Sequence, residues 1–290
     1  MKSTPPIASQ DETLRAILDE SGRPDKVPLR DGFVQGGERG KPHPGPLAEI
    51  VSRGRSRALD QYLLAVAWAS AAPWDVRKDS RIWARALGMS SEASGRSAVS
   101  RNWTFLANLK LIEVERSQRL ARVTLLREDG SGRPYRAHPA GDRSPRYLTL
   151  PFAYWTEGYS TSLSLPAKAI LLIARHLTDG FTLPAERAHD WYGISETTAR
   201  AGLRELREKD LLSARKQQRK APLAPNGYTT VNYYTLRKPF GPKSAEKRRS
   251  TPAQAVPAKA TLSKTARRSK PTKRTTTPTK TKPTQTKGTR

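Results

Sequence analysis

The sequence contains no cysteine, which excludes disulfide bridges, cysteine-ligated zinc, iron–sulfur clusters and thiol catalysis. It is also poor in acidic residues, with 26 Asp+Glu against 53 Lys+Arg in 290 residues and a formal net charge of +27. Such an excess of positive charge attracts nucleic acids, anionic membranes or acidic proteins. A chain of this length accommodates one large domain or two small ones.

Long apolar runs are missing as well. The longest, over residues 62–72, is broken by Ser70 and is far shorter than the ~20 residues needed to span a bilayer. The N-terminus, residues 1–6, has no apolar core of the kind that a secretory signal requires. The sequence therefore predicts a cytoplasmic protein located at the nucleoid, with no membrane as its partner.

Residue groups typical of enzymes are not found either. No two of the four histidines have the spacing of metal ligands. Because no His-x-His pair could hold a metal beside a tyrosine, the tyrosines of the second half are interpreted as packing residues rather than nucleophiles. We expect no catalytic residue, no bound metal and no cofactor, and hence a protein that is not an enzyme.

The chain carries one order of elements twice, namely helix, short strand, helix, helix and hairpin. Helices are predicted from apolar residues that recur at helical spacing, and hairpins from two strand-like runs around a polar turn. This order is that of a winged helix. In the first half the predicted elements are a helix from residue 57 that Pro73 ends, a strand at 74–76, helices at 81–87 and 96–108, and strands at 111–116 and 121–126. In the second half they are a helix at 166–177, a strand at 180–183, a helix at 184–192, a helix at 196–209 capped by Ser195, and strands at 211–215 and 228–236.

The two halves can be laid over each other at a constant offset of 100 residues. The matching apolar positions are Val99, Trp103, Leu106, Leu111 and Ile112 in the first half and Ala199, Leu203, Leu206, Leu211 and Leu212 in the second. A repeated core pattern is stronger evidence than either copy alone. The alternative is two unrelated amphipathic helices that both lead into apolar strands.

The predicted fold class is mainly α with small β-hairpins (α+β), in two tandem winged helix-turn-helix domains. The expected domains are residues 46–128 and 147–240. A flexible N-terminal segment, 1–45, and a linker rich in Gly, Pro and charge, 129–146, accompany them. Residues 241–290 hold fifteen of the Lys and Arg but the single acid Glu246, and this composition predicts a disordered basic tail.

The third helix of each half is the predicted DNA-recognition helix. Its apolar stripe would dock on the domain, and its opposite face carries small, hydrogen-bonding and basic residues suited to base edges and phosphates. The predicted contacts are Arg96, Ser97, Ser100, Arg101 and Thr104 on the first helix and Thr197, Thr198, Arg200, Ala201 and Arg204 on the second. The alternative is a plain solvated helix face in an ordinary bundle.

Basic residues also surround the turns of the two hairpins. Wings commonly lie along the minor groove or the DNA backbone, where such side chains neutralise phosphates. The alternative is a charged loop in solvent. The predicted phosphate contacts are Arg116, Arg119 and Arg122 in the first wing and Arg215, Lys216, Arg219 and Lys220 in the second.

Residues 147–177 carry a family resemblance. The residues Tyr-Leu-Thr-Leu-Pro-Phe, followed by Leu-Ser-Leu-Pro-Ala-Lys-Ala-Ile-Leu-Leu-Ile-Ala-Arg, resemble the opening of the N-terminal winged helix in RepA-type plasmid replication initiators. The match extends over residues 147–237 at most. The whole chain also looks like the tandem winged-helix proteins of actinobacteria. The resemblance implies DNA binding and raises replication initiation as an option.

Three functional hypotheses follow. The first is a sequence-specific double-stranded DNA-binding protein that regulates transcription. The second is a replication initiator of a plasmid or mobile element, whose tandem units read direct repeats. The third is a nucleoid-associated or RNA-binding protein driven by the basic tail. The sequence leaves open the target site, a small-molecule effector and whether the chain forms a homodimer.

Overall fold

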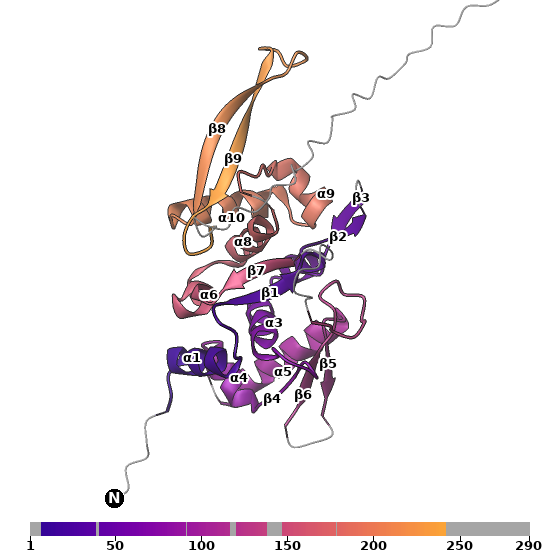
Figure 1. Ribbon diagram of the computed structural model, residues 1–290, viewed down its shortest axis with the longest axis vertical. Coiled ribbons are helices and arrows are strands. Elements are labelled where there is room, and N and C mark those ends of the chain that lie inside the picture. The colour runs from indigo at the N-terminus through magenta and orange to yellow at the C-terminus, as the bar shows by residue number, and fades with distance from the viewer. Residues whose placement is uncertain are drawn as a thin grey trace, which may run out of the picture. The chain divides into compact units, whose positions relative to one another are not determined.

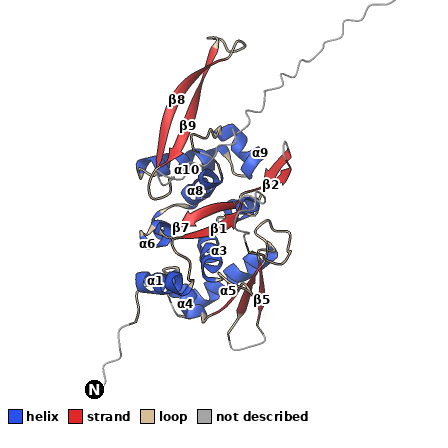
Figure 2. Ribbon diagram, in the orientation of Figure 1, coloured by secondary structure: helices blue, strands red, loops and turns tan. Residues whose placement is uncertain are grey.

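The computed structural model of the chain describes residues 7–38, 41–90, 92–116, 120–137, 147–177 and 179–241. Within these residues, helices are interspersed with antiparallel strands that pair in small sheets (Figures 1 and 2). The chain therefore has the mixed helix-and-strand architecture with small antiparallel sheets that the sequence predicts. The strands pair as β1–β7, β2–β3, β4–β6–β5 and β8–β9.

The first half follows the predicted order of elements. β6 lies between β4 and β5, so the strand after the first helix joins the hairpin in a three-stranded sheet. The Trp83 ring lies 5.1 Å from the Trp68 ring and 4.9 Å from the Trp103 ring, and this cluster joins the three helices. The elements are α3 (Ser56–Trp68), β4 (Asp75–Arg77), α4 (Ser80–Ala86), α5 (Ala93–Asn108), β5 (Ile112–Glu115) and β6 (Arg122–Leu125).

The third helix of this half begins three residues before the predicted start. It starts at Ala93, and Gly95 lies inside its first turn. A Cβ on Gly95 would lie only 1.7 Å from the Ser90 carbonyl oxygen, so this close approach of the preceding turn requires glycine. The sequence pattern misses the start because a glycine usually weakens a helix.

The second half repeats this arrangement. Phe181 forms an isolated antiparallel bridge with Tyr234 of β9, in the place that β4 takes beside β6. α10 packs on α8 at Gly202, where an added Cβ would lie 2.4 Å from the Pro166 carbonyl oxygen. The elements are α8 (Leu165–His176), η2 (Ala185–Arg187), α9 (Ala188–Tyr192), α10 (Glu196–Glu208), β8 (Leu212–Lys220) and β9 (Tyr228–Leu236).

The ends of α5 and α10 share backbone geometry as well as sequence spacing. Lys110 and Asp210 are separated by the same 100 residues that relate the two halves, and they have positive φ angles of 55° and 56°. In each case the next residue donates a backbone hydrogen bond to a helix carbonyl, from Leu111 to Leu106 and from Leu211 to Leu206. A left-handed residue is a common way to end a helix. The repeat therefore extends from side-chain pattern to chain path.

The predicted flexible segment, residues 1–45, is wrong for the part that the structure describes. Ser9 and Glu12 form a capping box at the start of α1, and that helix buries Leu14 and Ile17. β1 pairs with β7, more than a hundred residues away, and its Val27 is buried in the core. The elements of this segment and the helix after it are α1 (Gln10–Glu20), β1 (Lys26–Arg30), η1 (Asp31–Phe33), β2 (Gln35–Glu38), β3 (Lys41–Pro44) and α2 (Leu47–Ser52).

The predicted linker, 129–146, is also wrong in its first part. Tyr135 is buried, and the Arg136 carbonyl accepts a hydrogen bond from Arg30 at 2.7 Å. Arg30 also forms a buried ion pair with Glu128 at 2.6 Å. Residues 129–137 thus pack against β1. Residues 138–146 and the predicted tail beyond residue 241 lie outside the described residues.

The two halves share one core rather than forming two separate domains. The buried side chains of both halves form one continuous cluster. Three further elements precede α8 in the chain, namely β7 (Tyr147–Pro151), α6 (Ala153–Thr156) and α7 (Tyr159–Ser162). Buried polar side chains also connect the two halves. Asp60 of α3 binds Lys168 of α8 at 2.7 Å and accepts a hydrogen bond from Tyr154 of α6 at 2.6 Å. Among the described residues, no helix is long and apolar enough to cross a membrane.

Candidate nucleic-acid interface

α5 presents all five of its predicted contact residues to solvent. Val99, Trp103 and Leu106 form its buried side, and Asn102 is buried with them through a 2.9 Å hydrogen bond to Gln61 of α3. No acidic residue lies within α5. The exposed residues are Arg96, Ser97, Ser100, Arg101 and Thr104.

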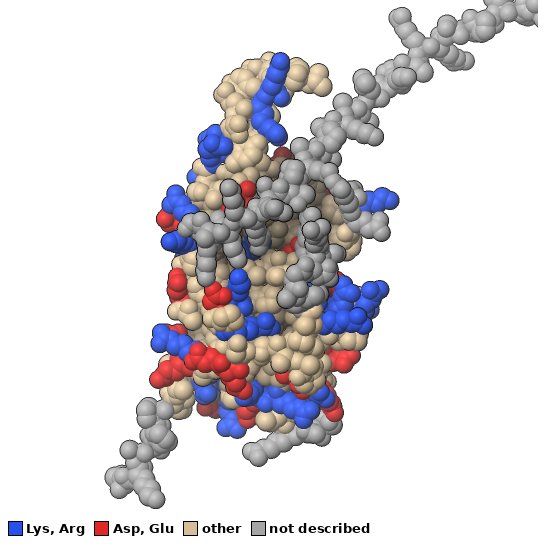
Figure 3. Space-filling model, viewed as in Figure 1, with Lys and Arg blue, Asp and Glu red and all other residues tan. Residues whose placement is uncertain are grey.

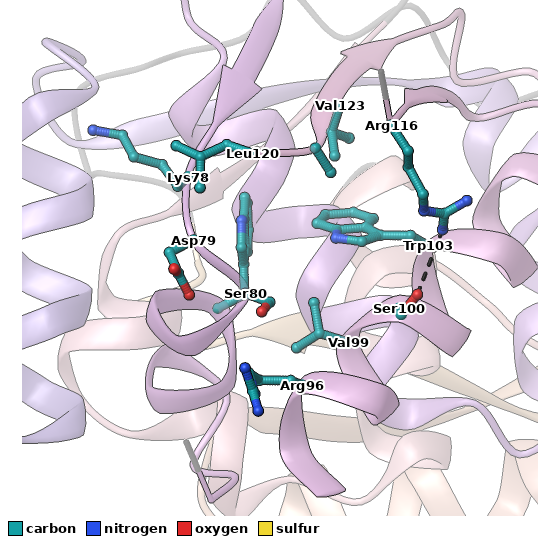
Figure 4. A pocket seen from close by; sticks show the side chains of 12 residues that line it. Lys78, Asp79, Ser80, Arg96, Val99, Ser100, Trp103, Arg116, Leu120 and Val123 are labelled. Atoms are coloured by element: carbon teal, nitrogen blue, oxygen red, sulfur yellow. Dashed lines mark hydrogen bonds between the residues drawn. The ribbon is translucent and has the colours of Figure 1, made fainter. Parts of the chain in front are cut away.

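A hollow of ≈ 300 Å³ lies beside α5, between the start of α4 and the β5–β6 hairpin. Trp103 faces it, and Arg96 and Arg116 lie on different sides of it (Figure 4). The Arg116 Nη2 atom is 3.5 Å from Ser100 Oγ. The remaining lining residues that carry charge are Lys78 and Asp79.

The charged side chains that line this hollow favour binding of an anion. Lys78 binds Glu20 at 2.6 Å, so its charge is already paired. Asp79 accepts a hydrogen bond from the Arg81 backbone N–H, which holds the pKa of its carboxyl below the usual range. Arg96 is attracted to the Asp79 carboxylate but forms no ion pair with it, and Arg116 has no ion-pair partner among the described residues. The two guanidinium groups could therefore hold a phosphate oxygen between helix and hairpin.

α10 presents its predicted residues less uniformly. Thr197, Arg200 and Arg204 are exposed, whereas Thr198 and Ala201 are half-buried. Thr198 also takes part in the helix cap, because its backbone N–H donates to Ser195 Oγ at 3.1 Å.

The arginines of α10 are paired along the helix. Arg200 binds Glu196, and this hydrogen bond raises the pKa of the guanidinium. Arg204 lies 3.8 Å from Glu208. Both pairs have i,i+4 spacing, so the sequence carries the signal that predicts them. α10 is therefore close to neutral on its outer face, and α5 is the more cationic of the two helices.

A third acidic residue of α10, Glu205, points toward α8 rather than into solvent. Glu205 accepts a 2.9 Å hydrogen bond from the Ser164 backbone N–H at the start of α8. Its carboxylate therefore serves the packing of two helices rather than the exposed face.

The residues predicted to contact phosphate in the first hairpin have different surroundings. Arg116 is exposed. Arg122 is half-buried, and its guanidinium binds Asp75 of β4 at 2.5 Å, so its charge is already paired. Arg119 lies outside the described residues.

The β8–β9 hairpin is a long ribbon that leaves the core. Only its base is buried, through Leu212, Tyr234 and Leu236, and no acidic residue lies between Leu211 and Leu236. Figure 3 shows basic side chains and no acidic ones along it. The four predicted cations are all exposed: Arg215, Lys216, Arg219 and Lys220.

Two features of the interface are missing from the sequence-based prediction. The ribbon also carries the amides Gln217, Gln218 and Asn232, which are exposed and suited to hydrogen bonding with bases. Its tip exposes Leu223. The prolines on either side of this leucine, Pro222 and Pro225, are the sequence signal that it lies in a turn.

No group of three or more His, Asp or Glu side chains gathers as a metal site within the part of the chain that the structure describes. Comparison of the chain with protein-family models, curated proteins and solved structures finds no match. Its function is therefore inferred from geometry and charge.

Proposed function

We propose that the chain is a sequence-specific double-stranded DNA-binding protein made of two winged-helix units. α5 and α10 are the recognition helices, and the β5–β6 and β8–β9 hairpins are the wings. The observation that carries the proposal is α5 itself. Its outer face is exposed and free of acidic residues, and it adjoins a hollow lined by Arg96 and Arg116.

Duplex DNA fits this surface better than a generic polyanion does. An α-helix with a polar outer face fits the major groove, and arginine can bind guanine there through two hydrogen bonds. The pairing of β1 with β7 and the Asp60–Lys168 ion pair join the two units. The protein would thus read two sequence elements at a fixed spacing.

Transcriptional regulation is the use that we propose, because occupancy of a promoter requires nothing beyond DNA recognition. Replication initiation is the second candidate. It is favoured by the segment that resembles RepA-type initiators, in which β7 ends at Pro151 and Ser164 caps the apolar helix α8, in the order that the resemblance implies.

Replacement of Arg101 by alanine tests the proposal directly. Arg101 is exposed and has no ion-pair partner among the described residues. Loss of a bidentate arginine–guanine contact costs about 1–3 kcal/mol, or roughly 5- to 150-fold in affinity for the preferred site. We expect Arg101→Ala to lose this affinity while keeping its non-specific binding.

The matched control is Arg53→Ala. Arg53 is also an exposed arginine, but it lies at the end of α2 and pairs with Glu49. Fluorescence anisotropy with labelled duplex, and with unlabelled duplex, single-stranded DNA and RNA as competitors, measures both variants. Equal affinities for the two variants, or equal competition by RNA, would argue against the proposal.

Removal of residues 242–290 separates this proposal from binding through the tail. Each phosphate that a protein neutralises on duplex DNA adds about −0.9 to the slope of log K against log salt. We expect the shortened chain to have a shallower slope of log K against log salt. It should keep its preference for the duplex sequence that the full chain prefers. A chain that loses nearly all of its affinity on shortening would instead be a non-specific binder that depends on the tail.

A further inference from the structure

The β8–β9 ribbon extends far beyond the core that supports it. Each strand has nine residues, which corresponds to roughly 30 Å of extended chain. All residues of β8 from Ala214 onward are exposed. An isolated two-stranded ribbon is marginally stable in water. Nothing in the described chain covers this one, so its length is best explained by an external partner.

The tip of the ribbon is an ordered turn that holds an apolar side chain in solvent. Backbone hydrogen bonds from Ala221 to Gly227, from Ala224 to Ala221 and from Gly227 to Ala224 close the turn. Leu223 is 91% exposed, more than any other large hydrophobic residue that the structure describes.

Charge identifies the class of partner. Arg219 and Lys220 end β8 directly below the tip, Arg215 and Lys216 precede them, and the ribbon has no acidic residue to oppose them. The amides of Gln217, Gln218 and Asn232 are interleaved with these cations along the ribbon. Basic and amide side chains of this kind read the minor groove of duplex DNA.

We propose that the β8–β9 ribbon lies in the minor groove and that Leu223 inserts between two base pairs and kinks the duplex. Apolar side chains inserted in this way unstack one base step and bend DNA by roughly 20–90°. The inference rests on the proposed function, because α10 leads directly into the base of β8. With α10 in the major groove, the ribbon crosses the phosphate backbone and reaches the next minor groove.

An anionic membrane is the other surface that attracts a basic ribbon with an apolar tip. Membrane binding of this kind depends on a large buried apolar face. The tip offers one leucine with Tyr228 beside it at the start of β9, and the strands below carry mostly polar and basic side chains. A single side chain suffices as a wedge in DNA but gives little anchorage in a bilayer.

The test is the shape of bound DNA, measured with the full chain. A duplex with a binding site selected from random DNA carries a fluorophore at each end for energy transfer. 2-Aminopurine placed at successive base steps of this site reports unstacking. We expect the wild-type chain to shorten the end-to-end distance and to raise 2-aminopurine emission. Leu223→Ala should lose both signals, and Leu223→Met, which keeps an apolar side chain of similar size, should retain them.

The control is Ile7→Ala, because Ile7 is a large apolar residue that is 78% exposed and far from the ribbon in sequence. A Leu223→Ala chain that binds DNA and still bends and unstacks it would overturn the wedge while leaving the proposed function in place. Loss of binding to phosphatidylserine vesicles in Leu223→Ala, with unchanged DNA bending, would overturn it in favour of a membrane. A wild-type chain that does not bind duplex DNA would overturn both proposals.

Discussion

Removal of residues 1–45 is expected to leave a chain that does not fold. This segment buries seven large apolar side chains in the common core: Leu14, Ile17, Leu18, Val27, Leu29, Phe33 and Val34. At about 1.5–3 kcal/mol for each, the loss is on the order of 10 kcal/mol or more, which equals or exceeds the ~5–15 kcal/mol that stabilises a typical domain. Deletion also removes β1 and leaves β7 without a partner strand.

Circular dichroism and hydrogen exchange measure this outcome. A chain that begins at residue 7, where the described structure starts, keeps the Ser9 cap of α1 and is expected to fold as the full chain does. A chain beginning at residue 46 that gave a cooperative unfolding transition close to that of the full chain would show that the N-terminal segment is dispensable.

The second large effect is expected at Lys168. Its side chain is 3% exposed and binds Asp60 at 2.7 Å and Ser56 at 3.1 Å. Lys168→Met leaves the Asp60 carboxylate buried without its cation, which costs about 3–5 kcal/mol. Arg53→Ala breaks an exposed pair with Glu49 and should cost less than ~1 kcal/mol.

Low pH should reduce the loss of folding stability that Lys168→Met causes. Burial raises the pKa of the Asp60 carboxyl, and Lys168 opposes this shift. The folded chain already binds a proton at Asp60 more readily than the unfolded chain does, and loss of the lysine increases this difference. The stability of the variant should therefore rise as the pH falls toward the unfolded value of about 3.9. Urea unfolding of the variant and the wild type at several pH values measures this difference.

A triple variant separates the ion pair from the packing around it. Lys168→Met, Asp60→Leu and Tyr154→Phe together remove both charges and the hydroxyl that donates to Asp60. Replacement of a whole buried polar group by apolar residues is often neutral or stabilising. We expect recovery of most of the lost stability. A triple variant as unstable as Lys168→Met would mean that cavity formation, rather than the unpaired charge, caused the loss.

Local patterns predict most of the elements around the candidate interface. Apolar spacing and the Ser195 cap predict α10 within one residue of its observed ends, and the same spacing places Val99 and Trp103 on the buried side of α5. These features depend on residues close together in the sequence. The exposure of the five α5 residues follows from helical geometry alone.

Long-range contacts explain what the sequence could not predict. β1 contains only two apolar residues besides its proline, Val27 and Leu29, and a strand this short shows no periodicity. Its order comes from β7 and from Glu128, far along the chain. The same holds for Arg122, whose partner Asp75 lies on a strand that becomes its neighbour only after folding.

The most direct test of the account is a selection from random duplex DNA with the full chain at near-physiological salt. The account predicts an enriched site with two sequence elements at a fixed spacing. Arg101→Ala should relax the preference within one element and leave the other. Recovered DNA without any preferred sequence, or an enriched site unchanged by Arg101→Ala, would contradict recognition by these helices.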